Sequence, residues 1–431
     1  MNLFDELEWR GLVHQATEGA REHVSTGSRT IYVGFDPTAD SLHVGSLLPL
    51  LALKRIADCG HRPLAVVGGA TGMIGDPSGK SAERSLQTIE QVEHNARCLK
   101  EQIARICGMG GSGGTGALPA DRIVFENNAD WLTKLTLIDL LRDVGKHFSL
   151  ASMIAKDSVK RRLEGQSGIS FTEFTYQVLQ AYDFLVLHQK HGCTVQVGGS
   201  DQYGNITAGI DLVHARAQAQ AFGITWPLVT SSSGVKFGKT EAGAVWLDAK
   251  RTSPYRFFQF WMNVEDEQVV KYLKLFTFLS QDEIAALEAE HAANPGARAA
   301  HKRLAEDVTR RVHGDDGLAR AQRATEVFFG GSMDALDVAE LQDVFGDVPS
   351  STQPRSKFDG EGLAVLDLMV DAQLATSRKD ARRAIESGGV YLNNQRVESH
   401  EAKVSQQSAL GGQVIVLRKG KRSYHVVRLE G

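Results

Sequence analysis

The chain has 431 residues, of which 42% are hydrophobic and 23% charged, and its formal net charge is -4. This composition is typical of a globular protein with two or three domains. No apolar run approaches the roughly 20 residues that a membrane-spanning helix needs. Residues 1–8 also lack the basic start and apolar core of a signal peptide. We therefore predict a cytoplasmic protein with no membrane partner.

Cysteine usage and charge distribution carry limited information. The four cysteines form no C-x-x-C pair and have no histidine at metal-ligand spacing, so we predict no metal site and no disulfide framework. Residues 361–431 hold 11 Lys and Arg against 8 Asp and Glu, which is net +3 and leaves -7 for the rest. A basic end on an acidic body indicates a polyanionic partner, although an ordinary solvated surface explains the same charges.

Short β-like runs alternate with helical patterns in the first half of the chain. The β-like runs cover residues 30–35, 63–67, 122–125 and 194–197. Helical patterns cover residues 46–59, 88–107, 131–147 and 171–190, and another begins at 205. This alternation predicts βαβ units, and therefore an α/β domain built on a parallel sheet.

The second half loses the β signal after residue 248. Residues 264–345 have helical patterns, and the polar, proline-bounded stretch 349–357 is typical of a linker. A short unit follows, with helices predicted near 364–370 and 378–387 and strands at 390–392 and 414–417. We therefore expect a helical domain and then a small α+β domain.

Two segments resemble the phosphate-binding loop of P-loop enzymes. They are Gly75-x-x-x-Gly79-Lys80-Ser81 and Gly234-x-x-x-Gly238-Lys239-Thr240. The P-loop pattern requires four residues between its glycines, and each segment has three. A P-loop phosphotransferase is therefore disfavoured, but glycines beside lysines still suit contact with phosphate.

A stronger pattern runs from Tyr32 to Leu47. Here a predicted strand leads through Gly34 and Asp36 to His43-Val-Gly45-Ser46 at the start of a helix, where free amides and the helix dipole attract phosphate. Each residue alone has an ordinary structural explanation, such as a turn or a packing glycine. As a contiguous block they resemble the first signature of class I aminoacyl-tRNA synthetases, in its tyrosyl form.

The resemblance extends over nearly the whole chain. Residues 68–84, 171–183, 198–202 and 236–240 are similar to tyrosyl-tRNA synthetase blocks in the family's order, and the last is the mobile lysine loop, the second class I signature. Residues from 363 onward are similar to the alpha-L RNA-binding domain that bacterial members carry. On these blocks the chain is identified as a member of the bacterial-type tyrosyl-tRNA synthetase family.

The resemblance implies an α/β fold with a Rossmann-like parallel-sheet catalytic domain, an α-helical domain and a small α+β alpha-L RNA-binding domain. The implied boundaries are 1–230 for the catalytic domain with a dimer-interface insertion at about 120–170, 231–247 for the mobile lysine loop, 248–346 for the helical anticodon-binding domain, 347–361 for a linker and 362–431 for the RNA-binding domain.

The resemblance also implies how tyrosine is bound. Tyr32 and Asp183 would hydrogen-bond the phenolic hydroxyl, so that an amino acid lacking this group would leave buried polar atoms unpaired. The other implied tyrosine residues are Asp76, Tyr176 and Gln180 at the ammonium group, and Asp36 and Gln202 near the carboxylate and the α-phosphate.

For ATP, the resemblance implies contacts along the first signature and the lysine loop. Ser46 is a departure, because the family commonly has a second histidine there, and serine can donate a hydrogen bond but reaches less far toward the ribose. The implied ATP residues are Gly34, Gly199 and Asp201 at the ribose, Thr38 and His43 at the β- and γ-phosphates, Gly45 and Ser46 at the helix start, and Lys80, Arg84, Lys236, Phe237, Gly238, Lys239 and Thr240 around the pyrophosphate.

The implied reaction activates L-tyrosine with ATP and transfers it to the terminal adenosine of tRNA(Tyr), with Mg²⁺ expected but no ligands identifiable. Partners would be L-tyrosine, ATP, tRNA(Tyr) and a second copy in a homodimer, with residues 131–163 at the interface. A tryptophanyl-tRNA synthetase is the nearest alternative, and Tyr32 with Asp183 argues for a phenol over an indole. A non-catalytic RNA-binding protein derived from a synthetase is another.

Overall fold

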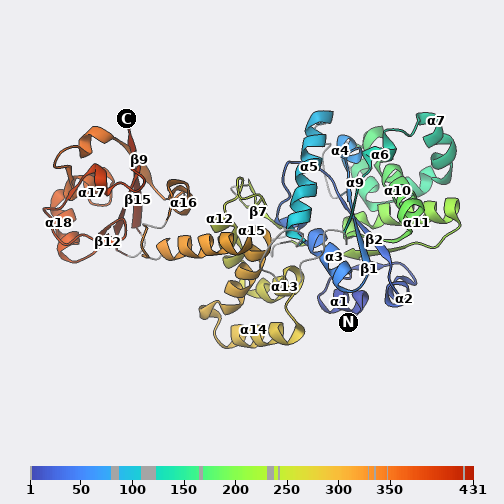
Figure 1. Ribbon diagram of the computed structural model, residues 1–431, viewed down its shortest axis with the longest axis horizontal. Helices are drawn as coiled ribbons and strands as arrows, with labels where there is room; N and C mark the ends of the chain where they lie inside the picture. The colour runs from blue at the N-terminus through green and yellow to red at the C-terminus, as the bar shows by residue number, and fades with distance from the viewer. Residues whose placement is uncertain are drawn as a thin grey trace. The chain divides into compact units, whose positions relative to one another are not determined.

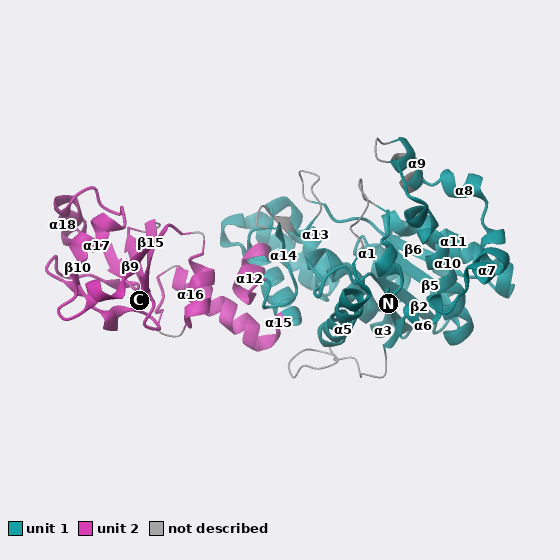
Figure 2. Cartoon of the chain, turned by 90° about the horizontal axis from the view of Figure 1, so that it is seen from above, with its two compact units in different colours: residues 1–251, 261–312 teal, residues 252–260, 313–431 magenta. Residues whose placement is uncertain are grey.

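The computed structural model describes residues 2–78, 87–107, 123–164, 168–230, 237–240, 243–328, 330–333, 336–346, 348–420 and 423–431. It divides into two compact units, which Figure 2 colours separately. Unit 1 comprises residues 1–251 and 261–312, and unit 2 comprises residues 252–260 and 313–431. In the part of the chain that is described, no helix is long and apolar enough to cross a membrane.

A mostly parallel sheet organises unit 1, with described strands in the order β1-β6-β5-β2-β3-β4. Strands β2 to β6 run parallel, and the short edge strand β1 is antiparallel to β6. The strand order reverses between β2 and β5, which is where parallel α/β sheets bind ligands beyond the strand ends. The strands are β1 Gln15–Ala16, β2 Thr30–Phe35, β3 Arg62–Val67, β4 Val124–Asn127, β5 Cys193–Gly199 and β6 Phe222–Trp226.

The central strands are hydrophobic on both faces because helices cover both. In β2, Ile31, Tyr32 and Val33 are all at most 2% exposed, which is typical of a parallel strand between helical layers. Figure 1 shows α3 and α5 on one side of the sheet and α10 and α11 on the other. These helices are α3 Leu47–Asp58, α5 Ile89–Ile106, α10 Phe171–His191 and α11 Tyr203–Ala217.

Caps fix the ends of the helices that carry candidate residues. The Ser170 hydroxyl accepts from the amide of Glu173 and begins α10, and Gly192 ends it with a left-handed φ of 61°. The Thr88 side chain caps α5 in the same way, through the amide of Gln91. Inside α10, Ala181, Phe184 and other apolar side chains pack against Tyr32 and the strands.

The predicted helix over 131–147 is broken in the structure. Residues 140–144 form a π turn and 145–147 a 3₁₀ turn, after two short helices. The remaining helices and strands of unit 1 are α1 Leu3–Trp9, α2 Ala20–Ser25, α4 Thr71–Ile74, α6 Ala129–Leu132, α7 Leu137–Asp139, α8 Leu150–Ile154, α9 Asp157–Glu164, β7 Lys239–Thr240, β8 Gly243–Ala244, α13 Asp266–Phe276 and α14 Gln281–Ala293.

Unit boundaries fall inside two helices, α12 Pro254–Met262 and α15 Ala299–Phe328. The unit division at 312/313 lies beside Gly314, whose φ of 74° and ψ of -179° interrupt the helical backbone of α15. Only glycine adopts this conformation readily. These units divide the chain differently from the domain ranges expected from sequence, which stay a prediction.

Unit 2 contains a sheet with described strands in the order β12-β11-β14-β15-β9. Helices α17 and α18 pack on it through Leu368, Met369 and Ile385. The sequence pattern predicted a linker over 347–361, but β9 lies within this range and pairs in parallel with β15. Elements not yet bounded are α16 Val338–Val344, β9 Ser350–Pro354, β10 Leu363–Ala364, α17 Val365–Asp371, α18 Arg378–Glu386, β11 Val390–Leu392, β12 Gln395–Arg396, β13 Lys403–Val404, β14 Val414–Lys419 and β15 Ser423–Glu430.

Candidate active site

A pocket of about 300 Å³ opens at the carboxyl ends of the strands of unit 1. Its walls come from the ends of β2, β3, β5 and β6 and from α10, so it lies at the point where the strand order reverses. The sequence predictions converge on this space. The predicted residues that line it are Tyr32, Gly34, Asp36, Gly45, Asp76, Tyr176, Gln180, Asp183, Gly199, Asp201 and Gln202.

Tyr32 and Asp183 form the closed end of the pocket. Both are nearly buried, with exposed fractions of 2% and 4%. Asp183 accepts from Asn128 Nδ2 at 2.9 Å and from Trp131 Nε1 at 2.7 Å. Among the described residues, the Tyr32 hydroxyl has no hydrogen-bond partner. A buried hydroxyl without a partner is costly, so a polar ligand group beside it would be stabilising.

Burial controls the titration of this closed end. Burial is the largest cause that raises the pKa of Asp183 to about 7; the hydrogen bonds from Asn128 and Trp131 act against it, and the charge of Asp36 acts with it. Burial, together with the charge of Asp183, also raises the pKa of the Tyr32 hydroxyl well above its usual value. Tyr32 is therefore a neutral phenol that can both donate and accept at neutral pH.

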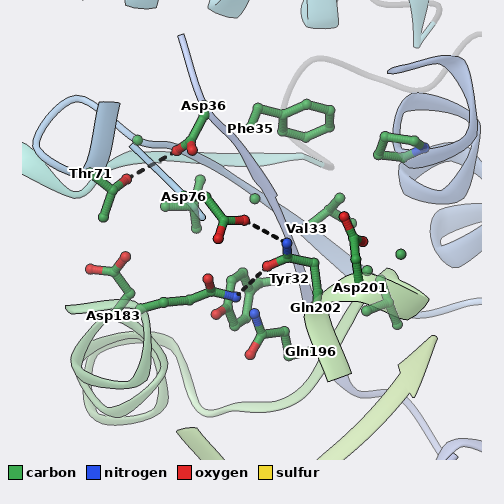
Figure 3. Close-up of a pocket in the computed structure, with 18 of the residues that line it drawn as sticks. Tyr32, Val33, Phe35, Asp36, Thr71, Asp76, Asp183, Gln196, Asp201 and Gln202 are labelled. Atoms are coloured by element: carbon green, nitrogen blue, oxygen red, sulfur yellow. Dashed lines mark hydrogen bonds between the residues drawn. The ribbon is translucent and has the colours of Figure 1, made fainter. Parts of the chain in front are cut away.

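A second group of polar side chains lines the middle of the pocket. Asp36 accepts from the Tyr176 hydroxyl at 3.0 Å and from the Thr71 hydroxyl at 3.1 Å. Asp76 accepts from Gln202 Nε2 at 2.6 Å, and Gln202 accepts from Gln180 at 3.2 Å. Figure 3 shows the Asp36–Thr71 and Asp76–Gln202 bonds across the pocket. These carboxylates make the middle of the pocket suited to a cation.

The first signature forms the open end, where Gly34 and Gly45 are exposed. His43 precedes a 3₁₀ turn, Val44–Ser46, that leads into α3. His43 Nδ1 accepts from the amide of Gly45 at 3.0 Å, so a neutral imidazole carries its proton on Nε2 and can donate from there. A Cβ at position 45 would lie 2.7 Å from His43 Cε1, so the position requires glycine.

Ser46 and Thr38 complete the predicted residues of the first signature. Ser46 is the residue before α3, and its side chain makes no capping bond to the helix. Thr38 is exposed, and its amide donates to the carbonyl of Asp36 at 2.9 Å. Neither residue lines the pocket, and His43 does not line it either.

The lysine loop is described in part. Phe237 lies in an aromatic cluster with Trp261, Tyr272 and Phe276, at centroid distances of 5.0 to 5.6 Å. Gly238 has a φ of 84°, and a Cβ there would lie 2.3 Å from Val44, which joins the loop closely to the first signature. The backbone at positions 239 and 240 forms β7. Lys80, Arg84 and Lys236 lie outside the described residues.

Sequence reasoning missed several residues of the pocket. Asn128 and Trp131 hold Asp183, and Asn128 also donates to Thr71 at 2.9 Å, linking the closed end to Asp36. The signal available was the polar run Asn127-Asn128 at the end of a strand, since carboxyl ends of parallel strands meet at one edge of a sheet. Gln196, another lining residue, comes from within β5.

The topology of the sheet and the segments around the pocket together define a class of protein. A parallel sheet with a reversal of strand order, and a His-x-Gly turn leading into a helix beside a lysine loop, is the arrangement of class I aminoacyl-tRNA synthetases. The family model described as tRNA synthetases class I (W and Y) matches residues 25–330. A second model, the Tyrosine–tRNA ligase SYY-like C-terminal domain, matches residues 340–427.

Relatives narrow this class to one family. The chain is 51% identical to a tyrosine–tRNA ligase of Roseiflexus castenholzii over 99% of each chain. It is 49% identical to a tyrosine–tRNA ligase of Opitutus terrae over 100% of both. A C-terminally truncated mitochondrial tyrosyl-tRNA synthetase of Aspergillus nidulans superposes with a TM-score of 0.66 at 32% identity, covering 76% of this chain and 94% of that one.

The chain belongs to the tyrosine–tRNA ligase family of class I aminoacyl-tRNA synthetases. The predicted fold class and family are thereby confirmed. Its reaction is the ATP-dependent joining of tyrosine to tRNA, and neither a tryptophan enzyme nor a P-loop phosphotransferase is favoured.

Proposed function

We propose that the pocket of unit 1 binds L-tyrosine with its phenol at the closed end and its carboxylate toward the open end, where ATP is bound. The observation that carries this orientation is the buried Tyr32 hydroxyl, which lacks a described partner, beside the buried carboxylate of Asp183. A phenolic hydroxyl donates to Asp183 and accepts from Tyr32, so one ligand group satisfies both.

In this orientation, the middle of the pocket receives the α-amino and carboxylate groups. Asp76, Tyr176 and Gln180 hold the ammonium, which suits one carboxylate and two neutral oxygens. Asp36 and Gln202 lie near the carboxylate and the α-phosphate. The hydrogen bonds from Tyr176 and Thr71 to Asp36 support this proposal, because they fix the carboxylate before the ligand arrives.

ATP would lie along the first signature and the end of β5. Gly34, Gly199 and Asp201 would contact the ribose, and His43 Nε2 and Thr38 would donate to the β- and γ-phosphates. The exposed glycines allow a nucleotide to approach the backbone closely. Gly45 and Ser46 would contribute from the helix start. Two groups of residues would close on the pyrophosphate as it forms: Lys80 and Arg84 of the block 68–84, and Lys236, Phe237, Gly238, Lys239 and Thr240 of the lysine loop.

The chemistry requires no protein nucleophile. The tyrosine carboxylate attacks the α-phosphorus, the bond to the bridging oxygen of pyrophosphate breaks, and tyrosyl-adenylate forms; the terminal adenosine hydroxyl of tRNA(Tyr) then displaces AMP. Catalysis comes from positioning and from stabilising charge on the phosphates. Among the described residues, no cluster of His, Cys, Asp or Glu could hold a metal ion, so Mg²⁺ would be held by the phosphates of ATP and enter with them.

An ATP–pyrophosphate exchange assay tests the orientation. We expect exchange with L-tyrosine, at least about 100-fold weaker exchange with L-phenylalanine because its ring leaves the Tyr32 hydroxyl unpaired and offers Asp183 no donor, and none with L-tryptophan. Comparable exchange with phenylalanine would contradict the proposed role of the closed end. Exchange driven by tryptophan would contradict the substrate itself.

The tRNA would contact unit 2. In unit 2, helix α18 has exposed basic side chains on one face and buried apolar ones on another. The exposed residues are Arg378, Lys379, Arg382 and Arg383, and the buried ones are Ala381 and Ile385. Charge reversal of Arg382 and Arg383 to Glu should raise the KM for tRNA about tenfold through lost phosphate contacts, and leave pyrophosphate exchange unchanged. The control is Arg62→Glu, which reverses an exposed cation of unit 1 at the amino end of β3, outside the expected anticodon-binding domain. A loss of exchange in the α18 variant would contradict a role confined to tRNA.

A homodimer is proposed through the insertion near α7 to α10. Large apolar side chains are exposed there, with Leu137 67%, Leu150 66% and Phe171 77% accessible. An apolar surface of this kind in a water-exposed chain marks an interaction site. Ile138→Asp should shift the protein from dimer to monomer in sedimentation analysis, and a monomeric wild-type chain would contradict the proposal.

A further inference from the structure

The residue Trp246 follows the lysine loop and lies against the catalytic histidine of the first signature. The His43 and Trp246 rings are edge to face, with centroids 6.2 Å apart and an interplanar angle of 72°. This is a favourable geometry for aromatic rings. Gly45 also borders the His43 ring, because a Cβ at this position would lie 2.7 Å from His43 Cε1.

Backbone hydrogen bonds hold Trp246 in this place. His43 and Trp246 form an antiparallel bridge. The amide of Val44 donates to the carbonyl of Val245 at 2.9 Å, and the amide of Leu247 donates to that of Leu42 at 2.8 Å. The amide of Val245 also donates to Gly238 in the lysine loop, at 3.0 Å. One short segment is therefore hydrogen-bonded to both signatures.

An ion pair supports the indole from outside. The guanidinium of Arg251 lies 4.4 Å from the centre of the Trp246 ring and pairs with Asp40 at 2.6 Å. A cation over the face of tryptophan is stabilising even at an exposed site. Asp40 belongs to the loop that carries Thr38, so Arg251 connects this loop to the indole that contacts His43.

We propose that Trp246 is a positioning residue for tyrosine activation. It fixes the imidazole of His43 so that Nε2–H points to the phosphates of ATP, and Arg251 holds the indole in place. This inference rests on the proposed role of His43 at the phosphates. Trp246 does not line the pocket, so in this proposal its effect passes through His43, and a double-mutant cycle measures such coupling.

The experiment compares Trp246→Leu with and without His43→Ala, measuring the rate of tyrosyl-adenylate formation and the Kd for tyrosine. With His43 present, Trp246→Leu should slow adenylate formation about fivefold, the size of an aromatic pair contribution, and leave the Kd for tyrosine unchanged. In the His43→Ala background the same change should have less than about a twofold effect. Trp246→Phe should restore most of the rate, because it keeps a ring edge.

Two further variants keep the test decisive. Arg251→Gln changes only a partly exposed side chain and should slow adenylate formation about twofold with His43 present, so it serves if Trp246→Leu fails to fold. The matched control is Trp9→Leu, a tryptophan of α1 whose indole donates to Glu6, and it should leave the rate unchanged. Equal effects of Trp246→Leu in both backgrounds would overturn the proposed role of Trp246 but leave the proposed role of His43 intact. A full rate in His43→Ala itself would instead overturn the proposed role of His43.

Discussion

At the closed end of the pocket, Asp183 is buried and accepts hydrogen bonds from two side chains, whereas the open end offers exposed glycine backbone and an imidazole. In the proposed orientation, the closed end would contact a part of tyrosine that does not change during the reaction. The open end would follow phosphates whose charge and position change. A site that recognises an unchanging group thus favours buried side chains held in place by hydrogen bonds. A site for phosphate transfer favours exposed backbone that the phosphates can approach closely, with space for them to move during the reaction.

Removing the acceptor at the closed end should have the largest effect. In Asp183→Asn the amide oxygen can accept from only one of the two donors, Asn128 and Trp131, while the NH₂ group faces the other, and the buried site loses its carboxylate acceptor. We expect tyrosine activation, measured as kcat/KM for tyrosine in pyrophosphate exchange, to fall by at least about 100-fold. The KM for ATP should be unchanged. A loss that appeared chiefly in the KM for ATP would show that the two ends are not separable.

The same carboxyl should give unliganded protein a distinctive stability profile. Its folded pKa is about 7 against an ordinary value of 3.8, so the folded state holds a proton that the unfolded state has lost between these pH values. Stability therefore falls as pH rises through this window, by about 4 kcal/mol, since each pKa unit corresponds to about 1.4 kcal/mol. Urea denaturation at pH 4.5 and pH 7.5 should show this fall in the wild type and a smaller one in Asp183→Asn. An equal loss of stability between the two pH values in the wild type and in Asp183→Asn would contradict the assignment of this effect to Asp183.

At the open end, an added methyl group should lower the rate of adenylate formation without changing the affinity for tyrosine. Gly45→Ala puts a Cβ against the His43 ring, so the imidazole must move. We expect adenylate formation to slow about tenfold, with the Kd for tyrosine unchanged. Gly296→Ala is the control, since a Cβ there meets its nearest neighbour at 3.6 Å. A weaker Kd for tyrosine in Gly45→Ala would show that the two ends are coupled.

The smallest effect is expected at Ser46. Replacing it with the histidine common in the family adds a longer donor at the start of α3, which makes no use of the Ser46 side chain as a cap. Ser46→His should change the adenylation rate by about threefold or less, without altering tyrosine affinity. Equilibrium dialysis with tyrosine and rapid-quench adenylation check both parts. A large change in tyrosine affinity would place Ser46 at the wrong end of the pocket.

The sequence allowed four of the six described strands of the unit 1 sheet to be predicted, because buried parallel strands are short apolar runs that end in polar residues, whereas β1 and β6 were not predicted. Residues 30–35, for example, were predicted as a strand and form β2. The partners of Asp183 were not predictable, since Asn128 and Trp131 lie 55 and 52 positions away and only the fold brings them together. Residues 131–147 were predicted as one helix but form short helices and turns. Helical periodicity does not show where tertiary contacts interrupt a helix.

The pairing of β9 with β15 explains why residues 350–354 have the composition of a linker. Their partners, 426–430, are 76 positions later, so during synthesis this strand is made long before the edge it joins. An apolar strand left unpaired for that time would be an aggregation site. The sequence Ser-Ser-Thr-Gln-Pro has the opposite character, hydrated and ending in proline. The polar composition that hid the strand from prediction therefore suits a strand that remains hydrated while unpaired and lies at the edge of its sheet once it is paired.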